Sequence, residues 1–306
     1  MKIAITGSKG LIGSALVPHL RSEGHEVVRV VRGEPDTGDV LWNPGEGTLE
    51  IDKLRGVDAV VHLAGAGVGD HLWSARYKET ILSSRVEGTS TLAEALSRMS
   101  NPPSVLVSAS AVGYYGSRGD ELLTETSGPG SGFLADVCGR WEAAASAVSE
   151  AGIRLVVVRT GVVLSGAGGA LKKQLPVFRL GAGARLGRGS QQLSWITRRD
   201  VAGAVSHLLR GDDLTGPFNV TAPRPVSNAT FTRALGHALH RPAVLAVPEM
   251  VLRVVVGAEM TSEFLLASQR AVPERLLKSG FTFADEELAD GLETALRDSA
   301  LVPPGG

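Results

Sequence analysis

Three glycines at every third position near the start of the chain place the strongest constraint on its fold. Gly7, Gly10 and Gly13 lie in the sequence ITGSKGLIGS, after the apolar run Ile3–Ile5 and before a helical pattern over Leu11–Ser22. In a strand–turn–helix unit, such glycines permit a tight turn, let a pyrophosphate approach the backbone, and let helix and strand pack closely. The start of the helix adds unpaired N–H groups. We therefore predict a dinucleotide-binding turn, with a purely structural glycine turn as the alternative.

Further apolar runs predict a parallel sheet. Val and Ile dominate them and strict alternation is absent, which is typical of strands covered on both faces. Helical patterns at about 74–99 and 134–150 separate the runs, and this alternation favours βαβ units with right-handed crossovers. The fold class is therefore α/β, with a Rossmann-type doubly wound parallel sheet. The runs are Ile3–Ile5, Val27–Val31, Ala59–Leu63, Val105–Val107 and Leu155–Val158.

The texture of the chain changes after Gly161. Residues 166–194 are rich in glycine and arginine and suggest long loops with one helix, and the pattern is mostly helical from Pro223 onward. We predict a Rossmann domain made of residues 1–165 and 195–222. A smaller, mostly helical substrate domain is predicted for residues 166–194 and 223–306.

Charge and cysteine content narrow the functional classes. The 31 basic and 32 acidic residues nearly balance, so nothing indicates binding to nucleic acid or to an anionic membrane. The single cysteine, Cys138, excludes an internal disulfide, and no apolar run is long enough to span a bilayer. With no signal-peptide pattern at its start, the chain is expected in the cytoplasm. His237 and His240 lack a third ligand nearby, so no metal site is predicted.

The end of the second predicted strand bears on the choice of dinucleotide. NAD sites usually carry an acidic residue there, whereas the sequence HEVVRVVRGE has Arg32. A guanidinium can hold a 2′-phosphate in bidentate geometry and stack on adenine, so Arg32 favours NADP. A solvated arginine is the plain alternative, and Glu34 leaves an acidic role open.

Two further segments are expected to line the cofactor. The run ending in Leu63, Ala64 and Gly65 brings small residues and bare backbone to the sheet edge, whereas His62 within it reads as a core residue. Arg85 lies on an otherwise apolar helical stripe, where it either contacts an anion or extends to water. The residues predicted to bind the cofactor are Gly7, Ser8, Gly10, Leu11, Ile12, Gly13, Arg32, Leu63, Ala64, Gly65, Arg85, Ser108, Ala109, Arg159 and Thr160.

Several segments, in order along the chain, resemble the extended short-chain dehydrogenase/reductase superfamily: TGSKGLIG, DAVVHLAG, EGTSTLAEA, VLVSASAVGYYG and WITRRDVAGAV. WSARYKETILSSRVEGT, PERLLKSGFTF and the segment from RTGVVLSG to WITRRDVAGAV are similar to its "epimerase family" branch, which includes proteins described as nucleoside-diphosphate-sugar epimerases or cell-division inhibitor homologues. Residues about 245–295 resemble the family-specific C-terminal domain of that branch. The resemblance covers essentially the whole chain and implies a Rossmann domain, a small substrate domain and NADP binding.

The chain departs from this family where catalytic members carry a Tyr-x-x-x-Lys pair. Ser110 matches the serine that orients the substrate oxygen. When the helix GFLADVCGRWEAAA is registered on Glu142, Leu134 takes the tyrosine position and Cys138 the lysine position. Leucine has no proton to exchange and a thiol has no fixed positive charge. Arg140 could supply charge but not act as acid or base.

Two tyrosines offer a substitute acid. Either Tyr114 or Tyr115 could donate a proton, although packing at the mouth of the sheet is favoured, since a phenol needs a nearby cation to ionise near neutral pH. The resemblance also places the loop RLGAGARLGRGSQQLSWI where family members hold a substrate diphosphate. Its predicted substrate-binding residues, with solvated arginines as the alternative, are Arg179, Arg185, Arg188, Gln191 and Trp195.

Two functions are consistent with these residues. The first is an NADP(H)-dependent oxidoreductase or nucleotide-sugar epimerase that acts on a small anionic or nucleotide-linked molecule, with catalytic roles for Ser110, Tyr114 or Tyr115. The second is a non-catalytic NADP(H)-binding regulator that acts through a protein partner, with a homodimer also left open. The intact Ser110 and arginine loop favour the first function, whereas the missing Tyr and Lys favour the second.

Overall fold

The computed structural model describes residues 1–298, which divide into two compact units. The first unit consists of Met1–Ala111, Asp136–Arg159 and Ala202–Phe218, and the second of Val112–Ala135, Thr160–Val201 and the described part of Asn219–Gly306. The domain boundaries proposed from the sequence stay a prediction, and their last residues, 299–306, lie outside the described residues.

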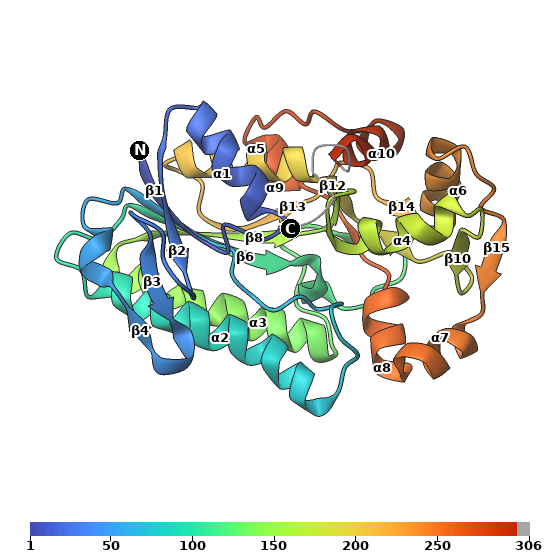
Figure 1. Ribbon diagram of the computed structural model, residues 1–306, viewed down its shortest axis with the longest axis horizontal. Helices are drawn as coiled ribbons and strands as arrows, with labels where there is room; N and C mark the ends of the chain where they lie inside the picture. Colours follow the sequence, from blue (N-terminus) through green and yellow to red (C-terminus); the bar gives the residue numbers. More distant parts are fainter. Residues whose placement is uncertain (299–306) are drawn as a thin grey trace. The chain divides into compact units, whose positions relative to one another are not determined.

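The first unit is built on an eight-stranded sheet with the order β13-β8-β6-β5-β1-β2-β3-β4 (Figure 1). β1 pairs in parallel with β2 and β5, β5 with β6 and β2 with β3, whereas β4 is antiparallel to β3. The strands are β1 (Lys2–Thr6), β2 (Glu26–Val31), β3 (Val40–Asn43), β4 (Thr48–Leu49), β5 (Ala59–His62), β6 (Val105–Ala111), β8 (Arg154–Thr160) and β13 (Gly216–Val220). The predicted doubly wound α/β fold is confirmed.

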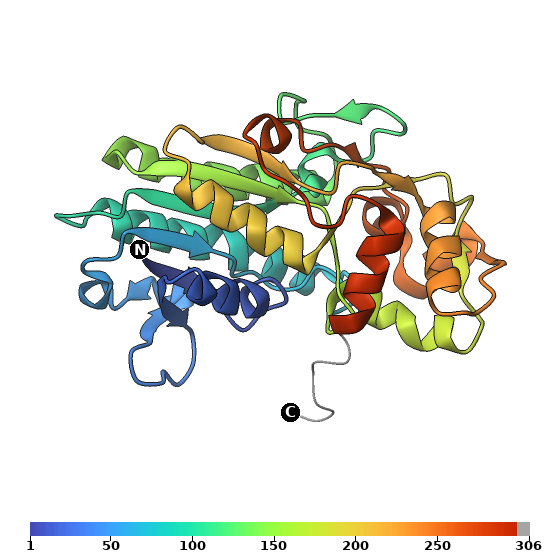
Figure 2. The same cartoon turned by 90° about the horizontal axis from the view of Figure 1, so that it is seen from above.

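Helices cover both faces of this sheet, which explains why its strands are apolar throughout. Figure 1 shows α1 (Gly13–Ser22) and α5 (Arg198–Arg210) on one face, and α2 (Ala75–Ser97) and α3 (Phe133–Ser146) on the other. α1 and α5 lie side by side in both views (Figure 2), and Glu23 after α1 accepts hydrogen bonds from Ser206 and Arg210 of α5. In β1, Ile3 and Ile5 are fully buried. Burial of apolar surface on both faces is the main stabilising contribution.

The strand order reverses at β1. The chain passes from β1 to β2 on one side and reaches β5 on the other. In a doubly wound sheet, the carboxyl ends of two such strands diverge and leave a crevice for a ligand. The glycine turn follows β1 and Leu63–Gly65 follow β5, so both predicted cofactor segments flank this crevice.

The second unit combines short two-stranded ladders with helices around its own core. Its ladders join β9 to β12, β10 to β15, β11 to β14 and β7 to β16. Its core includes Leu171, Phe178, Trp195, Phe231 and Leu292. The helix predicted between 166 and 194 is confirmed, whereas the ladders were not predicted because each has only two or three residues and a distant partner. The remaining elements are β7 (Leu122–Leu123), β9 (Val162–Leu164), β10 (Ala184–Leu186), β11 (Gln192–Leu193), β12 (Trp195–Thr197), β14 (Val226–Ser227), β15 (Leu245–Val247), β16 (Arg270–Ala271), α4 (Gly169–Arg179), α6 (Asn228–Ala238), α7 (Glu249–Val256), α8 (Ala258–Met260), α9 (Glu274–Lys278) and α10 (Leu288–Arg297).

Candidate cofactor and active site

The turn after β1 has a shape that excludes side chains. Gly7 has φ +66°, and a Cβ added there would lie 2.9 Å from the carbonyl carbon of Leu63. At Gly13 an added Cβ would lie 2.2 Å from the carbonyl oxygen of Gly7, which no side chain tolerates. α1 begins at Gly13 with no side-chain cap and no acidic residue in its first turn. The N–H groups of Ser14 and Ala15 donate to the carbonyls of Gly10 and Ile12, which leaves the backbone N–H groups just before them available to an anion.

A cavity of about 730 Å³ opens over this turn. Its volume lies in the range of small-molecule and cofactor sites. Leu11, Ile12 and Gly13, at the start of α1, stand outside its lining. Of the predicted cofactor residues, those lining the cavity are Gly7, Ser8, Gly10, Arg32, Leu63, Ala64 and Gly65.

The charges around the cavity distinguish Arg32 from its neighbours. Arg29 donates to Asp39 at 2.9 and 2.7 Å and to Asp36 at 2.6 Å, and its hydrogen bond lowers the pKa of Asp36. Those two carboxylates are therefore already paired. Arg32 is exposed, and within residues 1–298 no carboxylate lies at ion-pair distance from it. Glu34 also lines the cavity, so one acidic side chain remains there.

A buried network fixes the strand ends beside the cavity. The hydroxyl of Thr6 accepts hydrogen bonds from the backbone N–H groups of Leu63 and Ala64, at 3.1 and 3.3 Å. Its one proton therefore points to His62 Nδ1, 2.8 Å away, and Nε2–H of His62 donates to Thr89 at 3.0 Å. Burial lowers the pKa of His62 to about 4, so the ring is neutral. His62 is a core residue whose two ring nitrogens are both hydrogen-bonded, as expected, and its hydrogen bond to Thr6 also helps to fix the carboxyl edge of the sheet beside the cavity.

Arg85 lies at the same edge. Its guanidinium is 4.9 Å from the centre of the Trp141 ring, and it donates to the carbonyl of Ile81 at 3.0 Å. A Cβ added to Gly65 would lie 3.3 Å from the guanidinium carbon, so Arg85 packs directly against that backbone. It is half-buried, and burial lowers its pKa. Because no carboxylate among the described residues pairs with it, Arg85 is a second cation able to hold an anion.

Ser110 belongs to a cluster of buried polar side chains at the carboxyl end of β6. Its hydroxyl donates to Glu142 Oε1 at 2.6 Å. Arg159, at the end of β8, donates to both oxygens of Glu142, at 2.9 and 2.8 Å. Ser110 and Arg159 are each 4% exposed. Glu142 was not predicted as a site residue, because in the sequence it serves only to set the register of its helix.

Leu134 and Cys138 occupy the positions where the resemblance predicts the Tyr and Lys of catalytic family members. Cys138 is buried, and burial, followed by the charge of Glu142, raises its pKa to about 11. The thiol is therefore protonated near neutral pH. In the second unit, the backbone N–H of Leu134 donates to Glu263 at 3.1 Å. Arg140 is exposed and pairs with Asp136 at 3.0 Å, so its charge is directed away from the core.

The two tyrosines differ in environment. Tyr115 is fully buried, and its hydroxyl donates to Asn219 Oδ1 at 2.7 Å. It belongs to a small apolar cluster, against which Tyr114 packs edge-to-face with the ring centres 5.3 Å apart. The proton of Tyr115 is thus committed within the core of the second unit, which corresponds to the packing alternative. Tyr114 is half-buried.

The arginine loop of the second unit is partly exposed. Arg179 ends α4 and Arg188 follows β10, and both are exposed. Arg185 is half-buried and donates to the carbonyl of Gly187 at 2.6 Å, which stabilises the loop itself. These positions are compatible with an anion clamp and with solvated arginines alike.

The other two predicted substrate residues have structural contacts. Gln191 donates to the carbonyl of Leu186 at 3.2 Å. Trp195 is fully buried in the core of the second unit, and its indole N–H donates to the carbonyl of Arg224 at 3.0 Å. Trp195 therefore packs a core rather than lining a wall, because both its ring and its one polar atom are already engaged.

The remaining predicted cofactor residues lie at strand ends. Ser108 and Ala109 are buried within β6, at 1% and 8% exposure, and the Ser108 hydroxyl is a buried polar atom without a hydrogen-bond partner among the described residues. Thr160 ends β8 and is 9% exposed.

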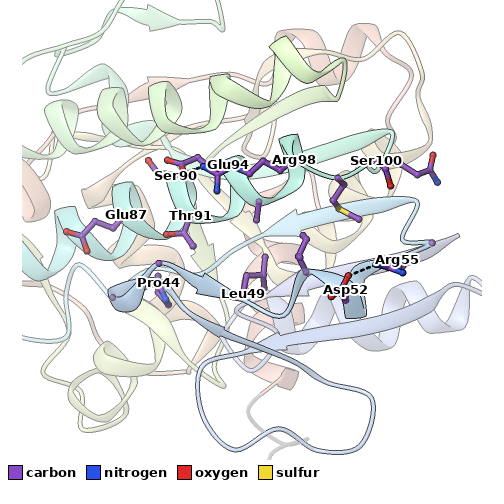
Figure 3. Close-up of a pocket in the computed structure, with 17 residues that line it drawn as sticks. Pro44, Leu49, Asp52, Arg55, Glu87, Ser90, Thr91, Glu94, Arg98 and Ser100 are labelled. Atoms are coloured by element: carbon purple, nitrogen blue, oxygen red, sulfur yellow. Dashed lines mark hydrogen bonds and ion pairs between the residues drawn. The ribbon is translucent and has the colours of Figure 1, made fainter.

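A larger groove of about 1100 Å³ lies elsewhere in the first unit (Figure 3). It runs between α2 and the segment around β4. Its cations are paired with its own acids, Arg55 with Asp52 at 2.7 Å and Arg98 with Glu94 at 3.2 Å. This groove therefore lacks the unpaired positive charge found beside the glycine turn.

Two absences complete the description. Among residues 1–298, no helix is both long enough and apolar enough to cross a membrane. In the same residues, no group of three or more His, Cys, Asp or Glu side chains could hold a metal ion.

Comparison with known proteins gives a consistent result. The NAD dependent epimerase/dehydratase family matches residues 3–221, and a domain of unknown function, DUF1731, matches residues 247–297. An epimerase family protein of Mycobacterium tuberculosis is 42% identical over 95% of this chain and 96% of its own length. A human epimerase family protein solved with NADPH is 33% identical, covering 97% of this chain and 99% of its own, with a TM-score of 0.89. A nucleoside-diphosphate sugar epimerase structure from Corynebacterium glutamicum is 38% identical, with a TM-score of 0.79, over 97% of this chain and 58% of its own.

Proposed function

Because the chain belongs to the NAD-dependent epimerase/dehydratase family, we propose that it binds NADP(H) in the crevice of its first unit and acts on an oxygen-bearing carbon of a small polar molecule. The family binds NAD or NADP, and the choice of NADP is our inference. The residues present fit such a group, since an added Cβ at Gly7 or Gly13 would clash with backbone where the chain must turn tightly beside the phosphates.

The observation that carries the proposal is the unpaired guanidinium of Arg32 in the cavity beside that turn. Of the acidic residues that follow Arg32 closely in the sequence, Asp36 and Asp39 form ion pairs with Arg29, whereas Glu34 does not. A 2′-phosphate would supply the missing anion for Arg32, and a charge-assisted pair of this kind is stronger than a neutral hydrogen bond. The human relative, whose structure was solved with NADPH, supports the same choice of cofactor.

The residues around the crevice would then have distinct roles. Gly7, Gly10 and the start of α1 would hold the linked phosphates, and Arg85 would hold a phosphate or a substrate anion. When bound, the nicotinamide supplies hydride chemistry. Ser110, at the carboxyl end of β6, would hold the reacting oxygen of the substrate.

The substrate class follows from charge. We propose an anionic or nucleotide-linked molecule, because Arg185 and Arg188 of the second unit offer cations on a glycine-rich loop. The name of the Corynebacterium relative, a nucleoside-diphosphate sugar epimerase, supports the same class.

A second function is favoured by one specific observation. The position that carries a catalytic lysine in family members holds Cys138, a buried thiol whose pKa is raised to about 11. A protein that binds NADP(H) without turning over a substrate, and that acts through a protein partner, would need no such lysine.

One experiment separates these functions. Calorimetric titration with NADPH and NADH measures the cofactor preference. Turnover of a panel of nucleotide sugars and carbonyl compounds is followed as NADPH consumption and, because an epimerase returns the hydride and consumes no net cofactor, also by NMR of the sugars. Preferential NADPH binding with turnover supports the enzyme, and the same binding without turnover supports the regulator. Absence of binding of either nucleotide contradicts both.

A further inference from the structure

Ser110, Glu142 and Arg159 form a buried cluster in which the direction of each hydrogen bond is fixed. We infer that Glu142 fixes Ser110 as a hydrogen-bond acceptor, so that this edge of the first unit selects a hydroxyl rather than a carbonyl oxygen of its substrate. This inference rests on the proposed function, because it requires a ligand oxygen at Ser110. Glu142 acts through Ser110 and is a positioning residue.

The direction of each hydrogen bond follows from the groups present. Arg159 donates through Nε to Oε1 of Glu142 and through a terminal nitrogen to Oε2. A guanidinium has only donors, so Glu142 accepts on both oxygens as a carboxylate. The 2.6 Å contact from Ser110 to Oε1 must therefore use the single hydroxyl proton of Ser110. Only lone pairs of Ser110 remain for a ligand.

Burial makes this arrangement hard to reverse. The side chain of Arg159 is 5% exposed and that of Glu142 is 15% exposed, so water competes little for either charge. Turning the Ser110 proton toward a ligand would give up a hydrogen bond to a charged acceptor, which is a strong one. Cys138 lies close to Ser110 but stays protonated, and it adds no charge to the cluster.

A ligand hydroxyl therefore meets Ser110 as donor to acceptor. A carbonyl oxygen in the same place would set its lone pairs against those of Ser110, which is repulsive. The strand register places Ser110 level with the cofactor segment after β5: His62 of β5 pairs with Ser108 of β6, and Ala64 and Ser110 each follow two residues later at the carboxyl edge. The class of ligand group selected here is thus an alcohol, as on a sugar or polyol.

The variant Glu142→Gln tests the inference by removing the charged acceptor. With its amide oxygen in the place of Oε1, its NH₂ group opposes the terminal nitrogen of Arg159, and in the other orientation it opposes Nε of Arg159. In either case Ser110 loses its hydrogen bond to a charged group, so its proton turns more easily toward a ligand. We expect wild-type protein to bind an alcohol about tenfold more tightly than the matching ketone, and Glu142→Gln to lose most of that ratio. Ser110→Ala removes the preference altogether.

The probes are two matched pairs, glycerol with dihydroxyacetone and cyclohexanol with cyclohexanone, measured by saturation-transfer NMR. Alcohols are titrated into protein saturated with NADPH, and ketones into protein saturated with NADP⁺, so that no turnover occurs. Arg140→Gln, an exposed change on the same helix, is the matched control and should keep the wild-type ratio. An unchanged ratio in Glu142→Gln, or no binding of any probe to the loaded wild type, overturns the inference.

Neutron diffraction from wild-type crystals provides a readout that requires neither a variant nor a substrate. The deuteron of Ser110 should lie on the line to Glu142 Oε1, and a deuteron pointing elsewhere overturns the inference. Failure of the proposed function is recognised separately, as the absence of NADPH binding in calorimetry.

Discussion

Two neighbouring regions of the sheet's carboxyl edge, the cofactor edge and the reaction edge, differ in what they are made of. The cofactor edge, defined by the turn Gly7–Gly13 and Arg32, contains glycines at which an added side chain would meet backbone. The reaction edge, defined by Ser110, Glu142 and Arg159, is made of side chains from β6, α3 and β8. The first tolerates almost no added atom, and the second depends on the direction of one proton. We therefore expect a bound nucleotide to be recognised by shape and charge, and a substrate oxygen by hydrogen-bond polarity.

The largest effect is expected at the cofactor edge, from Gly13→Val. Its Cβ would lie 2.2 Å from the carbonyl oxygen of Gly7, so the turn must open. We expect NADPH binding to weaken by about 100-fold or more, measured by fluorescence titration, together with a lower melting temperature. Gly139→Ala is the control, since an added Cβ there meets nothing within 4 Å. Wild-type binding by Gly13→Val would contradict the idea that the turn cradles phosphates.

Arg32→Asp tests whether the same edge also selects by charge. Loss of one charge-assisted phosphate pair should cost about 2 kcal/mol, or roughly 30-fold in NADPH affinity, and NADH affinity should change little. Arg55→Asp changes the charge equally in the larger groove, where Arg55 is already paired, and should affect neither nucleotide. Equal losses for NADPH and NADH would remove the argument from Arg32.

The buried ring of His62, on β5, makes the stability of the protein depend on pH. Its folded pKa of about 4 lies below the unfolded value of about 6.5, so the unfolded state binds the proton first as the pH falls. Stability is therefore lost between about pH 6.5 and 4, and His62 should account for about 2 kcal/mol of the loss between pH 7 and 5. Urea denaturation at both pH values measures it, with His62→Gln as the reference that lacks this titration. An identical pH dependence in the two proteins would show that the ring is not held neutral.

The smallest effect is expected from Cys138→Ala on the reaction edge. The thiol is protonated and buried, so its loss should leave NADPH affinity within about twofold of wild type. In the native protein, Cys138 should react with iodoacetamide at pH 8 at least about 100-fold more slowly than in unfolded protein. Rapid alkylation of Cys138 in the native protein would contradict this prediction, because it would show an accessible thiolate at the reaction edge.

The fold and the glycine turn could be predicted from the sequence because their patterns are local. The spacing of Gly7, Gly10 and Gly13 concerns one turn, and the five apolar strands each contain their own evidence. β3 was not predicted, because its four residues alternate between buried and exposed and pair with β2 only after the sheet forms. The arginine loop was recognised by composition, but composition did not distinguish an outward Arg188 from Arg185, which donates to its own loop.

The amino-acid sequence by itself determined the α/β class and the glycine spacing of the turn after β1, since each depends on residue type within a short window. The absence of Tyr and Lys from the expected helix positions follows from the family resemblance and stays a prediction. Tertiary structure alone decided that Trp195 fills a core, that Tyr115 donates a hydrogen bond to Asn219, and that Glu142 accepts hydrogen bonds from Ser110 and Arg159. These partners lie 17 to 104 residues apart along the chain. Hydrogen-bond direction and burial depend on which side chains the fold brings together, and a local pattern carries no information about that.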